Sequence, residues 1–459
     1  MDQLDIKSNS GTMDNKQIVA IVAVIVVVIA AAAAYFVLSG DNNDNKSEPY
    51  DISDIDLAVY GNANGDNTID QKDIDLINEI IDNGYSIDSY PLADANNDGT
   101  IDSKDVDKVK DIVAGNQTDV TLIDQYNETV TVSYPLKNLV VMSSDMIQMM
   151  IPFNGTDYIS GYVCSDSYPV VQKKLNDNTD ALRLCEGRQL TADGWQALTQ
   201  LDSSLQSAGE EIGAIIIMND EALTDYVDDV KASGIPTIHI RCTDPYLSLS
   251  GSILLGYLLG DETEKVSQEY VTDCRELLDL IDERVGSLSD EQKATFISMN
   301  MIYYVAENDS QYTYIGEAAG GLNVSGLEGD GSSKLQDTEA ITQYNGKLDA
   351  ILNITTKDCV NIDPSTLWEN KNIDKIQNSD AFEDMVFINA SMPTTIRVMY
   401  AAAVLYPEYF TVGEVDAAFQ KIVDKYMSYL DETVDDGNFD VSEDMMTIIT
   451  YQDYLDSKA

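Results

Sequence analysis

Histidine and cysteine are scarce in this sequence of 459 residues, which has one histidine and five cysteines. The cysteines form no C-x-x-C pair, so neither a paired-cysteine zinc site nor a dense disulfide framework is expected. One histidine, His239, leaves little room for a His-based catalytic triad or a histidine-rich metal site. The chain also lacks the G-x-S-x-G, H-E-x-x-H and phosphate-loop motifs. These absences argue against common hydrolases and against an ATPase.

Basic residues are also few. The chain has 27 lysines and arginines against 80 acidic residues, a formal charge of −53. Like-charge repulsion therefore argues against a nucleic-acid partner. Hydrophobic residues make up 44% and charged residues 23%, a balance that allows a buried core and argues against global disorder. A chain of this length suggests two to four domains.

An uncharged stretch over residues 17–40 is rich in valine, isoleucine and alanine. As a helix it would extend about 36 Å at about 1.5 Å per residue, enough for a hydrocarbon core of about 30 Å. We expect a transmembrane anchor here, and a cleaved signal peptide remains the alternative. Lys7 and Lys16 precede the stretch and Lys46 follows it. This weak bias places residues 1–16 in the cytoplasm and the bulk of the chain outside, at the cell membrane.

A repeated pattern follows a polar linker at 41–51, within the segment 52–116. Its two copies start at Asn62 and Asp94, 32 residues apart. Oxygen-bearing side chains fall at loop positions 1, 3, 5, 9 and 12, and a backbone carbonyl serves at position 7, a pattern that suits calcium. The expected calcium ligands are Asn62, Asn64, Asp66, Thr68, Asp70 and Asp73, and Asp94, Asn96, Asp98, Thr100, Asp102 and Asp105.

Position 6 of such a loop needs a sharp turn with positive φ. Gly99 adopts it freely, and Asn67 is the next most tolerant residue type. An amphipathic helix is expected after each loop. The pair resembles a type I dockerin, a small helical domain with paired EF-hand-like loops that docks onto a cohesin. Positions 10 and 11 are Gln71–Lys72 and Ser103–Lys104 in place of the usual Ser/Thr, so calcium binding is the firmer implication and cohesin binding the weaker one.

The rest of the chain predicts an α/β fold. Apolar strands alternate with helices over 120–245 and again over 287–432, as in parallel sheets with crossover helices. Residues 246–286 predict one long linking helix, with a break possible at Gly260, and residues 433–459 are expected to form a C-terminal tail. The predicted fold class is therefore two Rossmann-like lobes joined by a long helix, with the small helical domain and the anchor in front.

This order resembles the helical-backbone class of ABC-importer substrate-binding proteins, which carry ferric siderophores, haem or cobalamin. The segments that carry the resemblance are Tyr134–Met142, Asn154–Tyr162, Gly213–Met218 with Gly234–Pro236, Gly316–Asn323 and Ala401–Phe410. The resemblance implies a non-enzymatic protein that captures a bulky metal chelate between its lobes and delivers it to a permease with a separate ATPase.

Loops at the carboxyl ends of the predicted strands are expected to line the ligand cleft. Arginine can hold carboxylates, phosphates or catecholates with two parallel hydrogen bonds. A surface acid is an equally good partner for each arginine. Tyr162 and Tyr168 are more typical of core residues than of a stacking surface, and His239 is more typical of a structural histidine than of a haem ligand. The candidate ligand-binding residues are Ser144, Tyr162, Tyr168, Arg188, Arg241, Tyr303, Asn389 and Arg397.

The same resemblance implies one acidic docking residue on each lobe for the permease. Asp193 and Glu339 are the candidates. Two other functions stay open. One is a calcium-dependent adhesion or scaffold protein that docks through residues 52–116. The other is a dockerin-bearing hydrolase, with two catalytic carboxylates among its 80 acidic residues.

Overall fold

The computed structural model describes residues 55–458 except 167, 169–170, 173, 176–179, 301, 356–363 and 436. The expected cytoplasmic tail, membrane anchor and linker lie outside these residues. Within them, none of the helices is both long and apolar enough to cross a membrane. Four of the five cysteines are described, and all four are free thiols.

The segment 52–116, named here the calcium-loop module, is described from residue 55. Its two loops lead into helices α2 (Gln71–Asn83) and α3 (Ser103–Val113), as the sequence predicts. Each helix begins with a reciprocal cap. Asp70 accepts a hydrogen bond from the backbone of Lys72 at its helix start, while the Asp73 side chain accepts one from Asp70 N–H at 2.8 Å. Such caps satisfy the free N–H groups of the first turn. The apolar faces of both helices are buried.

A β-hairpin joins the module to the rest of the chain. It consists of β1 (Thr118–Ile123) and β2 (Thr129–Tyr134), which pair antiparallel. Val59 of the module bridges Leu122 of β1, and Tyr60 N–H donates to the Thr121 carbonyl at 2.9 Å. The module is therefore attached through backbone hydrogen bonds as well as through the chain.

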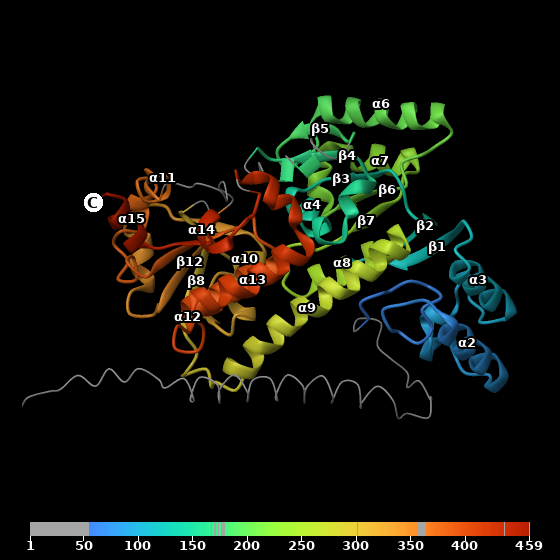
Figure 1. Cartoon of the computed structure of the whole chain (residues 1–459), viewed down its shortest axis with the longest axis horizontal. Helices are drawn as coiled ribbons and strands as arrows, with labels where there is room; N and C mark the ends of the chain where they lie inside the picture. The colour runs from blue at the N-terminus through green and yellow to red at the C-terminus, as the bar shows by residue number, and fades with distance from the viewer. Residues whose placement is uncertain are drawn as a thin grey trace, which may run out of the picture. The chain divides into compact units, whose positions relative to one another are not determined.

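The first lobe is built on a five-stranded parallel sheet with the order β5-β4-β3-β6-β7. Numbered along the chain this order is 3-2-1-4-5, which matches the first five strands of the Rossmann order. Its helices pack around the sheet (Figure 1). The elements are β3 (Leu139–Val141), α4 (Ser144–Met150), β4 (Ile159–Cys164), β5 (Leu182–Glu186), α6 (Ala192–Ala208), β6 (Ala214–Ile217), α7 (Val227–Ser233) and β7 (Thr237–His239).

Two helices, not one, link the lobes. Helix α8 (Leu247–Leu259) ends at Gly260, whose φ of 108° is open to glycine, and α9 (Asp261–Val285) follows. The helices pack closely, because a Cβ on Gly256 of α8 would lie 1.9 Å from the hydroxyl of Ser267 on α9. The chain therefore folds back at Gly260. Helix α8 is buried on nearly every side, and α9 also contacts α12 and α13 of the second lobe.

The second lobe departs from the expected Rossmann-like pattern because its sheet is mixed. Strands β8, β12 and β13 run parallel in the centre, and β10 pairs parallel with β8. Strand β9 pairs antiparallel with both β8 and β11, and β14 pairs antiparallel with β13. The strands are β8 (Thr295–Asn300), β9 (Tyr304–Ala306), β10 (Leu322–Asn323), β11 (Ser332–Lys334), β12 (Ala350–Thr355), β13 (Met385–Asn389) and β14 (Ile448–Ile449). The helices are α10 (Gln311–Ala318), α11 (Ser365–Trp368), α12 (Thr394–Leu405), α13 (Val412–Tyr426), α14 (Val441–Asp444) and α15 (Tyr451–Ser457).

The expected C-terminal tail is part of this lobe. Strand β14 completes the sheet beside β13, and the rings of Tyr451 and Tyr454 lie 5.1 Å and 6.2 Å from that of Trp368. Burial of these aromatic groups holds the end of the chain in place. Short 3-10 turns complete the fold: η2 (Ile87–Ser89), η3 (Pro91–Ala93), η4 (Ile151–Phe153), η5 (Gly155–Tyr158), η6 (Asp220–Ala222), η7 (Thr224–Tyr226), η8 (Ala340–Tyr344), η9 (Ile373–Lys375) and η10 (Ser428–Thr433).

Candidate functional site: a cleft between the lobes

A cleft of ≈ 600 Å³ lies at the carboxyl ends of the first-lobe strands. The loops after β3 and β6 lie at the point where the strand order reverses, which is where open α/β sheets bind ligands. The second lobe contributes Gln311, at the start of α10. Its side-chain oxygen is buried and has no hydrogen-bond partner within the described part of the chain. The lining includes Met142, Ser143, Ser144, Asp145, Tyr168, Glu186, Arg188, Gln189, Thr191, Asn219, Glu221 and Gln311.

Asp145 on α4 is the centre of the polar network beneath this cleft. Its carboxylate lies 3.2 Å from the guanidinium of Arg397 on α12, and it accepts a hydrogen bond from the Tyr168 hydroxyl at 3.1 Å. Arg397 also donates from Nε to the Met392 carbonyl at 2.7 Å. Burial, followed by the charge of Asp145, raises the pKa of Tyr168 well above its usual value, so this phenol stays protonated.

Arg188 is the exposed cation of the cleft. Desolvation lowers the pKa of its guanidinium, but the pKa is raised overall by interactions with Tyr312, Asp145 and Tyr168. Tyr312 belongs to α10 of the second lobe. Arg188 therefore stands close to groups from both lobes.

The structure brings together four of the eight sequence-predicted ligand-binding residues. Ser144, Tyr168 and Arg188 line the cleft. Arg397 lies below it, between two small cavities of ≈ 20 Å³ and ≈ 10 Å³. The Ser144 hydroxyl accepts from Ser165 N–H at 2.9 Å, which holds the loop after β4 against the start of α4.

The other four predicted residues lie elsewhere. Tyr162 is 1% exposed and packs in the hydrophobic core. Arg241 pairs with Asp244 at 3.4 Å, with its guanidinium over the ring of Tyr314. Tyr303 and Asn389 belong to the second lobe and are not among the described residues that line the cleft. The ring of Tyr303 packs on Tyr304 and under the Lys334 ammonium, and buried Asn389 donates a hydrogen bond to the Met446 carbonyl.

Nine of the twelve lining residues named above are not among the predicted ligand-binding residues, and Asp145 and Gln311 are two of them. Asp145 lies in the first turn of α4, where an acidic residue is also typical of an ordinary helix start. Gln311 lies in a segment without a recognisable strand before it. The usable signal for Asp145 is its position directly after the first buried strand, since first-turn residues of a following helix face the cleft.

The two docking candidates are exposed, one on each lobe. Asp193 lies in the first turn of α6, two residues after the cleft-lining Thr191. Glu339 precedes η8 in the second lobe. Their exposure is compatible with a partner on that face, and their role remains a prediction.

A second hollow of ≈ 710 Å³ lies on the second lobe. It includes Lys293, Ala294, Asp349 and Ala350, at the amino ends of β8 and β12. Ligands of open α/β sheets bind at the opposite, carboxyl ends. We therefore assign the ligand site to the cleft between the lobes, although this hollow is larger.

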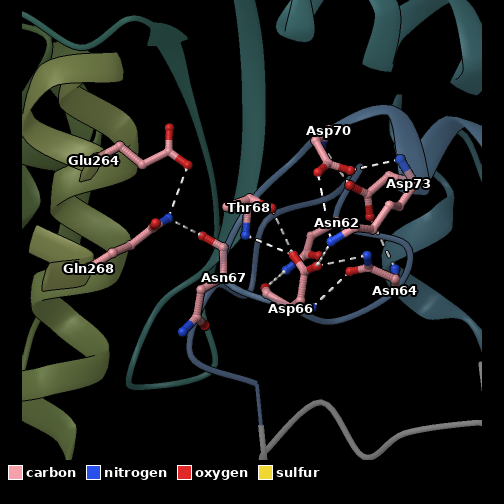
Figure 2. Close-up of polar contacts among 10 residues, drawn as sticks. Asn62, Asn64, Asp66, Asn67, Thr68, Asp70, Asp73, Glu264 and Gln268 are labelled. Atoms are coloured by element: carbon pink, nitrogen blue, oxygen red, sulfur yellow. Dashed lines mark hydrogen bonds and ion pairs between the residues drawn. The ribbon is translucent and has the colours of Figure 1, made fainter. Parts of the chain in front are cut away.

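The first predicted calcium loop presents oxygen atoms but is closed by internal contacts (Figure 2). In the first loop Asp66 accepts from Thr68 N–H at 2.8 Å, and Asp73 accepts from Asn64 N–H at 3.1 Å. Lys72 lies 3.6 Å from Asp66. Among the described residues, no group of three or more His, Cys, Asp or Glu side chains is placed to hold a metal ion.

The second loop repeats the pattern. Lys104 lies 3.1 Å from Asp98 and 3.3 Å from Asp102. Gly99 has the φ of 88° expected at position 6, whereas Asn67 of the first loop is not in the left-handed region, so the expectation for Asn67 is wrong. Its carbonyl is instead hydrogen-bonded to Gln268 of α9 at 2.8 Å.

The donor set nevertheless fits a hard cation. Every expected ligand is an amide, carboxylate, hydroxyl or backbone oxygen, the type that calcium prefers. Asp73 and Asp105 at position 12 are fully buried, and desolvation raises the pKa of Asp73 to about 7. Buried carboxylates of this kind are stabilised by a cation.

His239 is not among the residues that line the cleft, and its contacts are with two carboxylates. Its Nδ1 is 2.7 Å from Asp124 and its Nε2 is 3.1 Å from Asp220. The hydrogen bond with Asp124 raises the pKa of His239 against the effect of burial. This ring joins the β-hairpin to the loop after β6.

Solved structures match the chain in fold, whereas no protein-family model and no curated protein matches its sequence. The molybdate-binding periplasmic protein MolA of a Haemophilus influenzae ABC transporter, solved with molybdate, has a TM-score of 0.51 at 15% identity over 67% of this chain and 97% of that one. A periplasmic solute-binding protein of Veillonella parvula gives a TM-score of 0.47 at 14% identity, over 68% and 93%. A periplasmic haem-binding protein of Pseudomonas aeruginosa gives 0.43 at 15%, over 59% and 93%.

These identities establish the fold alone, and that statement rests on MolA. The chain has the mixed α/β fold of periplasmic binding proteins, which confirms the α/β part of the expected fold class. The matched proteins are solute-binding proteins. The dockerin resemblance of the calcium-loop module stays a prediction.

Proposed function

We propose that this chain is the substrate-binding protein of an ABC importer and that it captures a bulky metal chelate, such as a ferric siderophore, haem or cobalamin, outside the cell. The cleft between the lobes carries the proposal. It has room for a sizeable ligand, ≈ 600 Å³, in a fold that matches a periplasmic binding protein.

Three carboxylates, Asp145, Glu186 and Glu221, line the cleft together with Arg188, so the arginine offers a local contact for an anionic oxygen group of the ligand and not a positive pocket. The chain carries a formal charge of −53, yet Arg188 lines the cleft and Arg397 lies beneath it. A guanidinium can bind carboxylate or catecholate oxygens through two parallel hydrogen bonds. Among the described residues the buried Gln311 amide oxygen has no hydrogen-bond partner, so it can accept a hydrogen bond from a ligand donor.

Capture alone does not move a solute, so the proposal includes a permease and an ATPase as partners. Asp193 and Glu339 are the proposed docking residues, and we place the chain at the outer face of the cell membrane, held by residues 17–40. Residues 120–245 and 287–432, together with the segment that contains β14, form the two lobes. Protease accessibility of intact cells tests the orientation, since cleavage of the lobes requires that they lie outside.

Calcium is the proposed resident ion of the calcium-loop module. The twelve predicted ligands would hold two ions, and a bound ion would supply positive charge to the buried Asp73 and Asp105 carboxylates. Lys72 and Lys104 would have to leave the Asp66 and Asp98 carboxylates when it binds. Cohesin docking through the exposed Gln71 and Ser103 is a further, weaker proposal.

A thermal-shift panel tests the ligand class. Ferric siderophores, haem and corrinoids form one arm, and molybdate forms a second arm because MolA was solved with it. A ligand at 100 times its dissociation constant adds about 2.7 kcal/mol to the free energy of unfolding. A shift with a chelate supports the proposal. A shift with molybdate alone replaces the ligand class, and no shift in either arm contradicts solute capture in these classes.

A further inference from the structure

The first calcium loop is hydrogen-bonded to the helix that links the lobes. The side-chain amide of Gln268 on α9 donates to the backbone carbonyl of Asn67 at 2.8 Å (Figure 2). The same amide nitrogen lies 3.2 Å from the carboxylate of Glu264, one turn earlier on α9. Asn67 occupies position 6, and the next residue, Thr68, is the predicted carbonyl ligand at position 7. The contact is therefore made at the peptide that leads into the proposed ion site.

The two loops differ at this point. In the second loop Gly99 turns with a φ of 88° and donates its N–H to Asp94 within the loop, at 2.8 Å. In the first loop Asn67 does not make that turn, and its carbonyl faces α9. The first loop is thus the one that is hydrogen-bonded to α9 at position 6.

A second contact fixes the module to the same pair of helices. Asp56 accepts hydrogen bonds from the guanidinium of Arg275 on α9 at 2.6 Å and from the hydroxyl of Ser250 on α8 at 2.7 Å. Gln268 and Arg275 are seven residues apart, so they lie on one face of α9. This face of α9 therefore contacts the calcium-loop module.

The neighbouring surface of α9 contacts the second lobe. Tyr270 packs edge-on against Tyr426, with 5.3 Å between ring centroids, and lines a small cavity together with Arg397. Asp273 accepts from Lys425 at 2.9 Å and from the Tyr426 hydroxyl at 2.7 Å. Helix α9 therefore contacts the first predicted calcium loop through Gln268 and lines, through Tyr270, the small cavity that Arg397 also lines.

We propose that calcium in the first loop regulates the ligand cleft through Gln268 and α9. The inference rests on the calcium binding and solute capture proposed above. An ion held by the Thr68 carbonyl would order the Asn67–Thr68 peptide, and an ordered carbonyl gives Gln268 a fixed acceptor. Helix α9 is then held in the position in which Tyr270 lines the small cavity that Arg397 also lines. Since linkage is reciprocal, calcium raises solute affinity and a bound solute raises calcium affinity by the same factor.

Hydrogen exchange of the full chain in detergent, with and without saturating calcium chloride, tests this coupling. We expect amides over 261–285 to exchange more slowly with calcium, by about fivefold or more. Asp66→Asn removes a carboxylate from the first loop and should abolish this response. Its counterpart in the second loop, Asp98→Asn, should leave the response in place.

Gln268→Ala tests the proposed connection itself. The variant should lose most of the calcium response of 261–285, while α2 still responds. Gln206→Ala is the matched control, because Gln206 makes the same kind of bond one turn back, to Asp202 at 2.9 Å, on exposed α6. Unchanged melting of each variant without calcium shows that the fold is retained.

The outcomes separate the coupling from the ion site. If α2 responds to calcium but 261–285 does not, or if Gln268→Ala behaves as the parent chain, calcium binding stands and the coupling is wrong. If no segment responds to calcium, the proposed ion sites are wrong and the coupling falls with them. Either result leaves solute capture to the separate thermal-shift panel.

Discussion

Arg397 on α12 and Asp145 on α4 form an ion pair of 3.2 Å that joins the two lobes beneath the cleft. Their side chains are only 5% and 17% exposed. The Tyr168 hydroxyl donates a further hydrogen bond to Asp145, and the Met392 carbonyl accepts one from Arg397. Since a buried charge without its partner is costly, this pair makes the arrangement of the lobes depend on both residues.

Removal of this arginine is therefore expected to destabilise the protein. Arg397→Ala leaves the Asp145 carboxylate buried beside Tyr168 without its cation. We expect the free energy of unfolding to fall by about 3–5 kcal/mol, measured by urea denaturation. Arg284→Ala is the control: its ion pair with Glu414 is more exposed, and its loss should cost about 1 kcal/mol or less. Equal losses in the two variants would contradict the assigned role of Arg397.

His239 predicts a pH dependence of stability. Its hydrogen bond with Asp124 raises its pKa above the ordinary value of about 6.5, so the protonated ring stabilises the fold. This contribution is complete below about pH 6.5 and is lost as the pH rises through the raised pKa. The stability difference between the parent chain and His239→Gln should therefore shrink from about pH 6 to about pH 9 in urea titrations.

The opposite trend would show that the ring is neutral in the folded protein. Because the chain has one histidine, a single ring resonance also reports its pKa directly by NMR.

The packing of α8 on α9 predicts a position that tolerates no side chain. Gly256→Ala places a methyl group 1.9 Å from the Ser267 hydroxyl oxygen. We expect a loss of about 1–3 kcal/mol in the free energy of unfolding, because overpacking displaces the helices. Gly413→Ala on α13 is the control, since its Cβ has open space within 4 Å. A stable Gly256→Ala variant would mean that the two helices are not packed as described.

Arg188 should act on ligand binding more than on folding. It is exposed in the cleft, so Arg188→Ala should change the unfolding midpoint little. Loss of a charge-assisted contact costs about 1.5–3 kcal/mol, so affinity for an anionic chelate should fall at least tenfold by calorimetry. Lys110→Ala, an exposed cation on α3, should bind as the parent does. If both variants bind alike, Arg188 does not contact the ligand.

Local patterns in the sequence predict most of the described framework. The apolar runs that end at Met142, Val163 and Met218 correspond to β3, β4 and β6. The paired loops and the helices after them are found at the expected positions. These signals are strong because each depends on residues that are adjacent along the chain.

Several short strands near the sheet edges are not predicted by such local patterns. Strand β5 alternates weakly, and β9, β11 and β14 are short, so neither length nor periodicity distinguishes them from loops. Strand β14 forms only because β13 offers it an antiparallel edge. Tyr162 is predicted as a cleft residue but lies in the core. The pattern predicts the strand but not the face on which this ring is buried.

The sequence by itself determined the charge, the α/β class, the two oxygen-rich loops and the arginines available to a ligand, because composition and spacing are properties of the chain alone. Only the tertiary structure decided which residues meet. Asp145 and Arg397 are 252 positions apart, and Gln268 and Asn67 are 201 apart. Such pairs depend on how α9 and the lobes pack, and packing is a property of surfaces brought together by the whole fold.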